Sequence, residues 1–213
     1  MQKTVVFDFD GTIADTEGLL LRSIEHVLGE LSEEDIQAYK YMTDKEFMEY
    51  LGISSITGLF YYKKGKRFFR KHADELDIFP HVDVLVKRLA EKGRVGVLSK
   101  NERQTIESVL NRRGLKDVFS FIEHTSILSS KKKKLLEIQE EYGDIIYVGD
   151  QVEDVEAANH ADCLCIGVSW GHHSKTFLQE ANPTRIVSSV KGLEEAIYSL
   201  CGRSSSSTSQ DNT

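Results

Sequence analysis

Two aspartates near the start of the chain, Asp8 and Asp10, are the residues of this sequence best suited to chemistry. They come directly after the apolar run Val5–Phe7, and Gly11 and Thr12 follow them. Because side chains alternate along a strand, both carboxylates are expected on one face at its carboxyl end. At about 5 Å and an effective dielectric near 20 they would repel by roughly 3 kcal/mol. We therefore expect a bound cation or a raised pKa on one of them; two solvated acids at a strand end are the alternative.

Polar residues also follow the other strands that the sequence predicts. In a parallel sheet, ligands bind beyond the carboxyl ends of the strands, so these residues are expected to meet at one rim. Besides Asp8 and Asp10 they are Ser99, Lys100, Asn101, Asp150, Asp154 and a lysine that follows the third strand. Oxygen ligands without histidine or cysteine favour Mg²⁺. Since a carboxylate can attack phosphorus and form an acyl phosphate, the set predicts phosphoryl transfer.

Each member of this set has an expected role. Asp8 lies deepest and is the expected nucleophile. Asp10 beside it can protonate the leaving oxygen and then deprotonate a water. Ser99 and the N-terminus of the helix after it can donate hydrogen bonds to phosphate oxygens. The lysine balances the negative charge of the nucleophile and the phosphate.

The periodicity of apolar residues predicts the elements that hold this site. A helical insertion without a convincing strand fills residues 15–79, with helix starts at Ser32 and Thr43. From Pro80 helices and strands alternate: helices over 81–92, 102–113, 131–142 and 152–160, and strands over 94–98, 118–122, 145–148 and 163–168. This order predicts an α/β, Rossmann-like, doubly wound parallel sheet with an inserted helical cap domain. The core is expected over residues 1–14 and 80–200, the cap over 15–79, and a disordered tail over 203–213.

Four motifs in this order resemble those of the haloacid dehalogenase-like (HAD) superfamily: Asp8-Phe9-Asp10-Gly11-Thr12, Ser99-Lys100-Asn101, a downstream lysine and Gly149-Asp150-Gln151-Val152-Glu153-Asp154. The helical insertion and Val168-Ser169-Trp170-Gly171 resemble phosphoglycolate-phosphatase-like members with a helical cap. The resemblance implies a Mg²⁺-dependent phosphatase that hydrolyses a small phosphomonoester through an aspartyl-phosphate intermediate. It implies metal ligation by the Asp8 carboxylate, the Asp10 main-chain carbonyl and the Asp150 carboxylate, with Asp154 in support. Expected phosphate-binding residues are Gly11, Thr12, Ser99, Lys100, Asn101 and the lysine.

The lysine motif departs from the pattern of this subgroup. Its usual lysine-proline pair is missing, and the run Lys131–Lys134 stands in its place. The superfamily lysine often lies four residues before the first core leucine, which is Leu135 here. This spacing selects Lys131 as the catalytic lysine, with Lys132 as the next candidate.

Two further segments carry groups that could act on a substrate. The basic, aromatic stretch 61–71 holds six basic residues and four aromatics. It could be a cationic rim facing an anionic substrate. We favour the alternative, a solvated helix face whose aromatics point inward. Trp170, Gly171, His172 and His173 could line the rim. Thr12 and Glu17 could touch the cap or the substrate, and Glu17 could instead simply begin a helix. We expect His172 and His173 to form an exposed polar loop and not to bind metal.

The composition of the 213 residues limits the possible partners. A net charge of −7 argues against nucleic-acid or anionic-membrane binding, and no apolar run approaches the roughly 20 residues of a membrane span. We expect Cys163, Cys165 and Cys201 to be core thiols. With no signal peptide ahead of the first strand, we expect a cytoplasmic enzyme. Its expected partner is a small phosphorylated metabolite. A sugar phosphomutase or phosphotransferase, a non-catalytic phosphate-binding regulator and recruitment of a macromolecular phosphate by residues 63–71 remain alternatives. Substrate identity and oligomeric state are not readable from the sequence.

Overall fold

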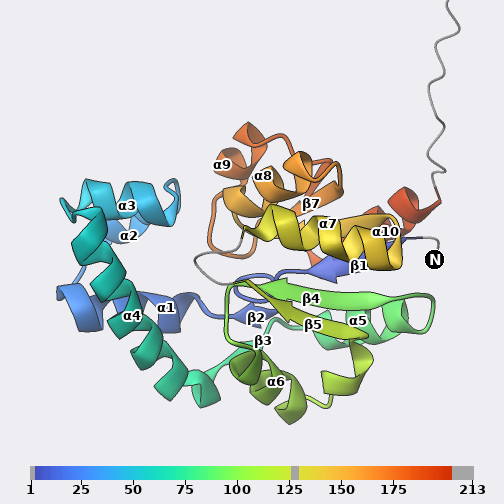
Figure 1. The fold of residues 1–213 in the computed structure, drawn as a ribbon, viewed down its shortest axis with the longest axis horizontal. Coiled ribbons are helices and arrows are strands. Elements are labelled where there is room, and N and C mark those ends of the chain that lie inside the picture. Colours follow the sequence, from blue (N-terminus) through green and yellow to red (C-terminus); the bar gives the residue numbers. More distant parts are fainter. Residues whose placement is uncertain (1–2, 126–129, 203–213) are drawn as a thin grey trace, which may run out of the picture.

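A computed structural model describes residues 3–125 and 130–202 of the chain (Figure 1). Its centre is a six-stranded sheet in which every neighbouring pair is parallel. The strands, in spatial order, are β5 (Phe121–His124), β4 (Val95–Ser99), β1 (Thr4–Phe7), β6 (Ile145–Gly149), β7 (Leu164–Val168) and β8 (Arg185–Val187). The tail predicted to be disordered, 203–213, lies outside the described residues.

Helices cover both faces of this sheet. Val5 and Phe7 of β1 pack with α5 (Val82–Ala90), α6 (Arg103–Arg112) and α10 (Val190–Cys201). Val6 points to the other face, which is covered by α7 (Lys131–Tyr142), α8 (Val152–His160) and α9 (Lys175–Glu180). Strands that are buried on both faces are continuous apolar runs, which is why β1 and β6 could be identified in the sequence. The predicted Rossmann-like, doubly wound fold is confirmed.

The order of the strands determines where a ligand can bind. The chain runs from β1 to β4 and β5 on one side, and then returns to β6 on the other side of β1. Such a reversal leaves a crevice at the carboxyl ends of the central strands, here β4, β1 and β6. The residues that follow these three strands are those singled out for chemistry.

The predicted strand over 118–122 begins too early. Lys116–Val118 form a 3-10 turn, η2, and β5 starts only at Phe121, where it pairs with Gly96 of β4. Phe119 is nevertheless 7% exposed, because it packs into the core from the turn. A short apolar run is buried in either conformation, so periodicity does not separate the two.

The insertion after the first motif is helical, as expected. It consists of α1 (Glu17–Leu28), α2 (Glu33–Tyr39), α3 (Asp44–Tyr50), α4 (Ser55–Lys71) and the 3-10 turn η1 (Ala73–Glu75). The predicted starts are confirmed, since Ser32 and Thr43 each form a capping box with the acid three residues later. Figure 1 shows these helices projecting from one end of the sheet.

A short antiparallel ribbon that the sequence did not predict joins the insertion to the sheet domain. Its two strands are β2 (Ala14–Asp15) and β3 (Asp77–Ile78). The ribbon lies at the expected boundaries of the cap, and the division into core 1–14 and 80–200 and cap 15–79 stays a prediction. Among the described residues, no helix has the length and apolar character needed to cross a bilayer. Cys163 and Cys165 are free and buried, as expected of core thiols.

Candidate active site

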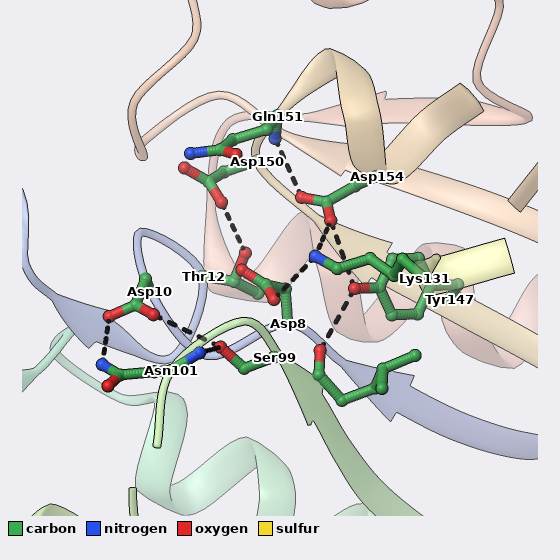
Figure 2. Close-up of polar contacts among 11 residues, drawn as sticks. Asp8, Asp10, Thr12, Ser99, Asn101, Lys131, Tyr147, Asp150, Gln151 and Asp154 are labelled. Carbon is green, nitrogen blue, oxygen red and sulfur yellow. Dashed lines mark hydrogen bonds and ion pairs between the residues drawn. The ribbon is translucent and has the colours of Figure 1, made fainter. Parts of the chain in front are cut away.

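Three aspartates converge beyond the central strands (Figure 2). Asp8 follows β1, Asp150 follows β6, and Asp154 lies in the first turn of α8. One carboxylate oxygen of each lies within 4.8 Å of the other two. The residues are 5%, 0% and 0% exposed, respectively, so the cluster is almost shielded from water. The backbone N–H of Asp8 donates to the carbonyl of Val148 at 2.7 Å, which aligns the ends of β1 and β6.

The burial of these acids has an electrostatic consequence. Burial raises the pKa of Asp8 to about 7, with Asp154 and Asp10 adding to the effect and Lys131 opposing it. Burial, together with Asp154 and Asp8, also raises the pKa of Asp150 well above its ordinary value. Three ionised carboxylates beside one ammonium leave two uncompensated negative charges. A divalent cation offsets them, and a donor set made of oxygen alone fits Mg²⁺.

Lys131, the first residue of α7, supplies the positive charge of this cluster. Its Nζ donates to Asp8 Oδ1 at 3.0 Å and to Asp154 Oδ1. Burial lowers the pKa of Lys131, but Asp154 and Asp8 outweigh burial and hold this pKa well above its usual range, so the ammonium stays charged. Lys132, the second candidate, is exposed, and Lys134 pairs with surface glutamates. The structure thus places Lys131 in the cluster, as the spacing to Leu135 predicted.

The Asp10 side chain points away from the three-aspartate cluster. Asn101 Nδ2 donates to Asp10 Oδ1 at 3.0 Å, and the Ser99 hydroxyl donates to Asp10 Oδ2 at 3.3 Å. Strand alternation no longer applies at Asp10, because β1 ends at Phe7. Burial raises the pKa of Asp10 against the lowering effect of these two hydrogen bonds, as suits a group that exchanges a proton.

The other expected phosphate-binding residues have different surroundings. The Thr12 hydroxyl donates to Asp150 Oδ1 at 3.1 Å, so it orients a carboxylate in this structure. Gly11 has φ +71° and lies so close to Asp150 that an added Cβ would be 2.1 Å from Oδ2. Lys100 is exposed, whereas Ser99 and Asn101 are buried beside Asp10. Their roles in phosphate binding stay predictions.

Three residues contact the aspartates in ways that the sequence did not indicate, although Gly149 and Gly171 lie within its motifs. The Tyr147 hydroxyl donates to Asp154 Oδ1 at 3.2 Å. An added Cβ at Gly149 would lie 2.4 Å from Asp154 Oδ2, and one at Gly171 would lie 2.4 Å from Asp150 Oδ2. These contacts depend on how β6, α8 and the loop after β7 pack against one another, for which a single sequence holds no signal.

The close approach of Gly171 to Asp150 makes it sensitive to substitution. We expect Gly171→Ala to displace the Asp150 carboxylate and to lower the Mg²⁺ affinity by roughly 10–100-fold, a typical effect of disturbing the support of a metal ligand. Titration of activity with Mg²⁺ measures this change. Gly202→Ala, where the added Cβ would have no atom nearer than 3.6 Å, is the matched control. Equal Mg²⁺ affinities in the two variants would contradict the packing argument.

The loop holding His172 and His173 is not exposed, so that expectation is wrong. The two residues are 6% and 2% exposed, because α2 and the segment after it cover them. The His172 backbone N–H donates to Asp150 Oδ2 at 2.7 Å, and its ring packs edge-on against Tyr39. The sequence alone predicts that a polar loop is solvated, because it does not show that a distant insertion packs over the loop.

His173 connects the insertion to the loop after β6. Its Nδ1 accepts the backbone N–H of Val152 at 2.9 Å, and its Nε2 lies 3.0 Å from the Met42 carbonyl. Because Nδ1 is an acceptor, the proton must be on Nε2, which donates to Met42. The backbone N–H of Ser174 donates to the Lys40 carbonyl at 3.1 Å. Residues 172–174 therefore tie the position of residues 39–42 to Asp150.

Two substitutions at His173 separate its two hydrogen bonds. Asparagine can still accept from Val152 but is too short to reach Met42, whereas glutamine can reach Met42 but loses the acceptor near its Cβ. We expect His173→Gln to weaken Mg²⁺ binding by about tenfold and His173→Asn to weaken it less, because only the Val152 bond orients the Asp150 loop. Mg²⁺ titrations of both variants measure the difference. A weaker Mg²⁺ affinity in His173→Asn than in His173→Gln would contradict this assignment.

A pocket opens beside the cluster, between the start of α1 and the loop after β7. Its lining includes Asp10, Gly11, Glu17, Leu20, Phe79 and Trp170. The Trp170 indole donates to the Thr12 carbonyl at 3.3 Å, which holds this wall in place. Trp170, Gly171 and His172 thus line the rim, as the sequence suggested, and Glu17 lines the same pocket.

Known proteins that resemble this chain over most of its length include proteins named as phosphatases and a pyrophosphatase. A phosphoglycolate phosphatase from Synechococcus elongatus is 26% identical over 208 residues, which cover 93% of this chain and 98% of the relative. A pyrophosphatase PpaX from Bacillus mycoides is 24% identical over 204 residues, covering 89% and 94%. A solved structure titled as a predicted phosphatase from Clostridium acetobutylicum superposes with a TM-score of 0.81 at 24% identity, covering 92% and 98%.

The family assignment comes from residues 5–168. This range matches the haloacid dehalogenase-like hydrolase family and contains all four motifs, from Asp8 to Asp154. It covers well over half of the chain, and the expectation of an enzyme of this kind is confirmed. The chain belongs to the haloacid dehalogenase-like hydrolases.

Proposed function

We propose that the protein is a Mg²⁺-dependent phosphatase that hydrolyses a small phosphomonoester through an aspartyl phosphate on Asp8. The observation that carries this proposal is the buried cluster of Asp8, Asp150 and Asp154 with a single compensating lysine. Such a cluster is too costly in free energy to serve structure alone, since each buried charge needs a partner. The relatives named as a phosphoglycolate phosphatase and a pyrophosphatase support a small phosphorylated substrate.

Asp8, Asp10 and Lys131 each have a separate role in the proposed reaction. Asp8 Oδ attacks phosphorus and the leaving oxygen departs, which forms the acyl phosphate. Asp10 protonates that oxygen, and its carboxylate then takes a proton from the water that attacks the acyl phosphate in the second step. Lys131 holds the Asp8 carboxylate in position and offsets the charge that gathers around phosphorus. Asn101 and Ser99 orient Asp10 through their hydrogen bonds to both of its oxygens.

The three clustered aspartates are the residues that would hold Mg²⁺, together with the main-chain carbonyl of Asp10. When bound, the ion screens the repulsion between the phosphate and the carboxylates. Thr12 and the backbone N–H of His172 keep Asp150 oriented for this role, through one hydrogen bond to each of its oxygens.

An assay of phosphate release tests the proposal. We expect the purified protein to hydrolyse p-nitrophenyl phosphate with Mg²⁺ and to lose this activity with a chelator, regaining it when Mg²⁺ is restored. Product analysis with a sugar phosphate separates hydrolysis from phosphoryl transfer to a second hydroxyl. Turnover that is unchanged by the chelator would contradict the metal dependence, and a phosphorylated product in place of inorganic phosphate would favour a mutase.

A further inference from the structure

The basic, aromatic stretch 61–71 lies on α4, and its side chains fall on different sides of that helix. Within α4, all of which is described, no residue is fully buried. Phe68 and Phe69 pack against the core, in agreement with the expected inward aromatics. Tyr62, Lys66 and Arg70 recur every fourth residue and therefore share another side of the helix.

This second side of α4 runs along the segment that follows β4. The Arg70 guanidinium donates to both carboxylate oxygens of Glu102, at 3.3 and 3.2 Å. One turn earlier, Lys66 Nζ lies 3.5 Å from the Lys100 carbonyl. Lys100 stands between Ser99 and Asn101, the two residues that hydrogen-bond to Asp10, so this side of α4 lies beside the active site.

Lys66 differs from its neighbour in lacking a carboxylate partner. Arg70 is neutralised by Glu102. Within residues 3–125 and 130–202, no carboxylate oxygen forms an ion pair with Lys66 Nζ; its contacts are the long one to the Lys100 carbonyl and the Tyr62 ring at 5.8 Å. An ammonium without an acid beside it, half-buried next to the segment that holds Asp10, is suited to bind an anion.

The electrostatics of nearby groups agree with this placement. The positive charge of Lys66 is one of the influences that lower the pKa of Asp10 against the raising effect of burial. The pKa of Tyr62 is raised by burial and then by Asp44, Asp10 and Glu102, which agrees with a position of this ring on the same side of α4 as Lys66. Lys66 and Tyr62 therefore both interact electrostatically with Asp10, the carboxylate that would protonate the leaving group.

We infer that Lys66 binds a second anionic group on the substrate, so that the preferred substrates are phosphomonoesters whose leaving group also carries a carboxylate or a phosphate. The inference rests on the proposed function. With phosphorus at Asp8 and the leaving oxygen at Asp10, the rest of the leaving group would extend toward Lys66, which lies against the segment that holds Asp10. The other basic residues of α4, such as the exposed Lys64, have no such position.

Two substrates that differ only in this anion test the inference. Phosphoglycolate carries a carboxylate where hydroxyethyl phosphate carries a neutral hydroxymethyl group. We expect wild-type kcat/KM to favour phosphoglycolate by roughly 10–100-fold, the size of a charge-assisted hydrogen bond. Lys66→Gln should remove most of this preference, mainly by raising KM for phosphoglycolate, while Lys66→Arg should keep it. Lys64→Gln, which removes the same charge from the same helix, should leave the preference intact.

The outcomes separate this inference from the proposed function. Equal losses with both substrates in Lys66→Gln, or an unchanged preference, would overturn the role of Lys66 while leaving a phosphatase. So would a wild-type enzyme that favours hydroxyethyl phosphate. Calorimetric binding of phosphoglycolate to wild type and Lys66→Gln provides a readout that needs no turnover. Binding that depends on Lys66, without hydrolysis of either substrate or of p-nitrophenyl phosphate, would support the anion site and contradict the phosphatase.

Discussion

Asp8→Asn is expected to lower kcat for any phosphomonoester substrate by about 10⁴-fold or more, because the amide is a poor nucleophile and the acyl phosphate does not form. The same change should not unfold the protein. Since burial raises the pKa of Asp8 from 3.8 to about 7, this carboxyl costs stability that grows from about pH 4 to pH 7 and is fully present at pH 8, and the amide removes this cost. We therefore expect the metal-free variant to unfold at a higher urea concentration than metal-free wild type at pH 8.

Steady-state kinetics and urea unfolding in the presence of a chelator measure both effects. Asp117→Asn is the matched control, because it makes the same chemical change at an exposed position far from the cluster. Retained turnover in Asp8→Asn would contradict the assignment of Asp8 as the nucleophile. A loss of stability in the metal-free variant would show instead that the carboxylate stabilises the fold through Lys131.

Lys131→Met is expected to have the largest effect on stability, with a loss of about 3–5 kcal/mol in the free energy of unfolding. Lys131 lies between Asp8 and Asp154, and its removal leaves two buried carboxylates without their shared partner. The methionine keeps the length of the side chain, so the loss comes from charge and not from a cavity. We expect kcat to fall by at least about 100-fold, since the nucleophile loses the cation that positions it.

Lys132→Met serves as the control for this prediction. Lys132 is the neighbouring residue on the same helix, but it is exposed. Urea unfolding and phosphatase assays of the two variants give the comparison, and we expect Lys132→Met to unfold and turn over like wild type. Two variants with the same unfolding midpoint would contradict the assignment of Lys131 to the cluster.

The parts of the site that the sequence could predict are those set by local pattern. The run Val5–Phe7 is buried on both faces of a strand, and such a run is recognisable without knowing its neighbours. Once the sheet is parallel, the residues after each strand must share one rim, which brings Asp8 and Asp150 together. Lys131 could be selected because, in the superfamily that the motifs resemble, the lysine often lies four residues before the first core leucine, which is Leu135 here.

The features that could not be predicted depend on contacts between distant segments. Gly171 matters because it nearly touches Asp150, a proximity that only the folded loops create. His172 and His173 are buried because residues 39–42 pack over them, so their polar character misled the prediction of an exposed loop. The two-residue strands β2 and β3 are too short to show any alternation.

The basic residues of α4 are a second case in which contacts between distant segments could not be predicted. Six basic residues of α4 are alike in the sequence, and the charge run alone favours a solvated face. Their difference lies in their partners: Arg70 contacts a carboxylate, whereas Lys66 contacts the carbonyl of Lys100, between the two residues that hydrogen-bond to Asp10. Only the placement of α4 against residues 99–102 distinguishes them.

Trapping of the acyl phosphate tests the central claim most directly. Asp10→Asn with p-nitrophenyl phosphate is suited to this, because p-nitrophenolate leaves without needing a proton while the attack of water has lost its base, so the intermediate should accumulate. Borohydride reduces an acyl phosphate to the alcohol, so after incubation with substrate and Mg²⁺ the peptide containing residue 8 should carry homoserine in place of Asp8. Conversion at Asp8, absent without substrate and absent in Asp8→Asn, is the result expected here. Phosphate release with an unmodified Asp8 peptide would contradict nucleophilic attack by this carboxylate.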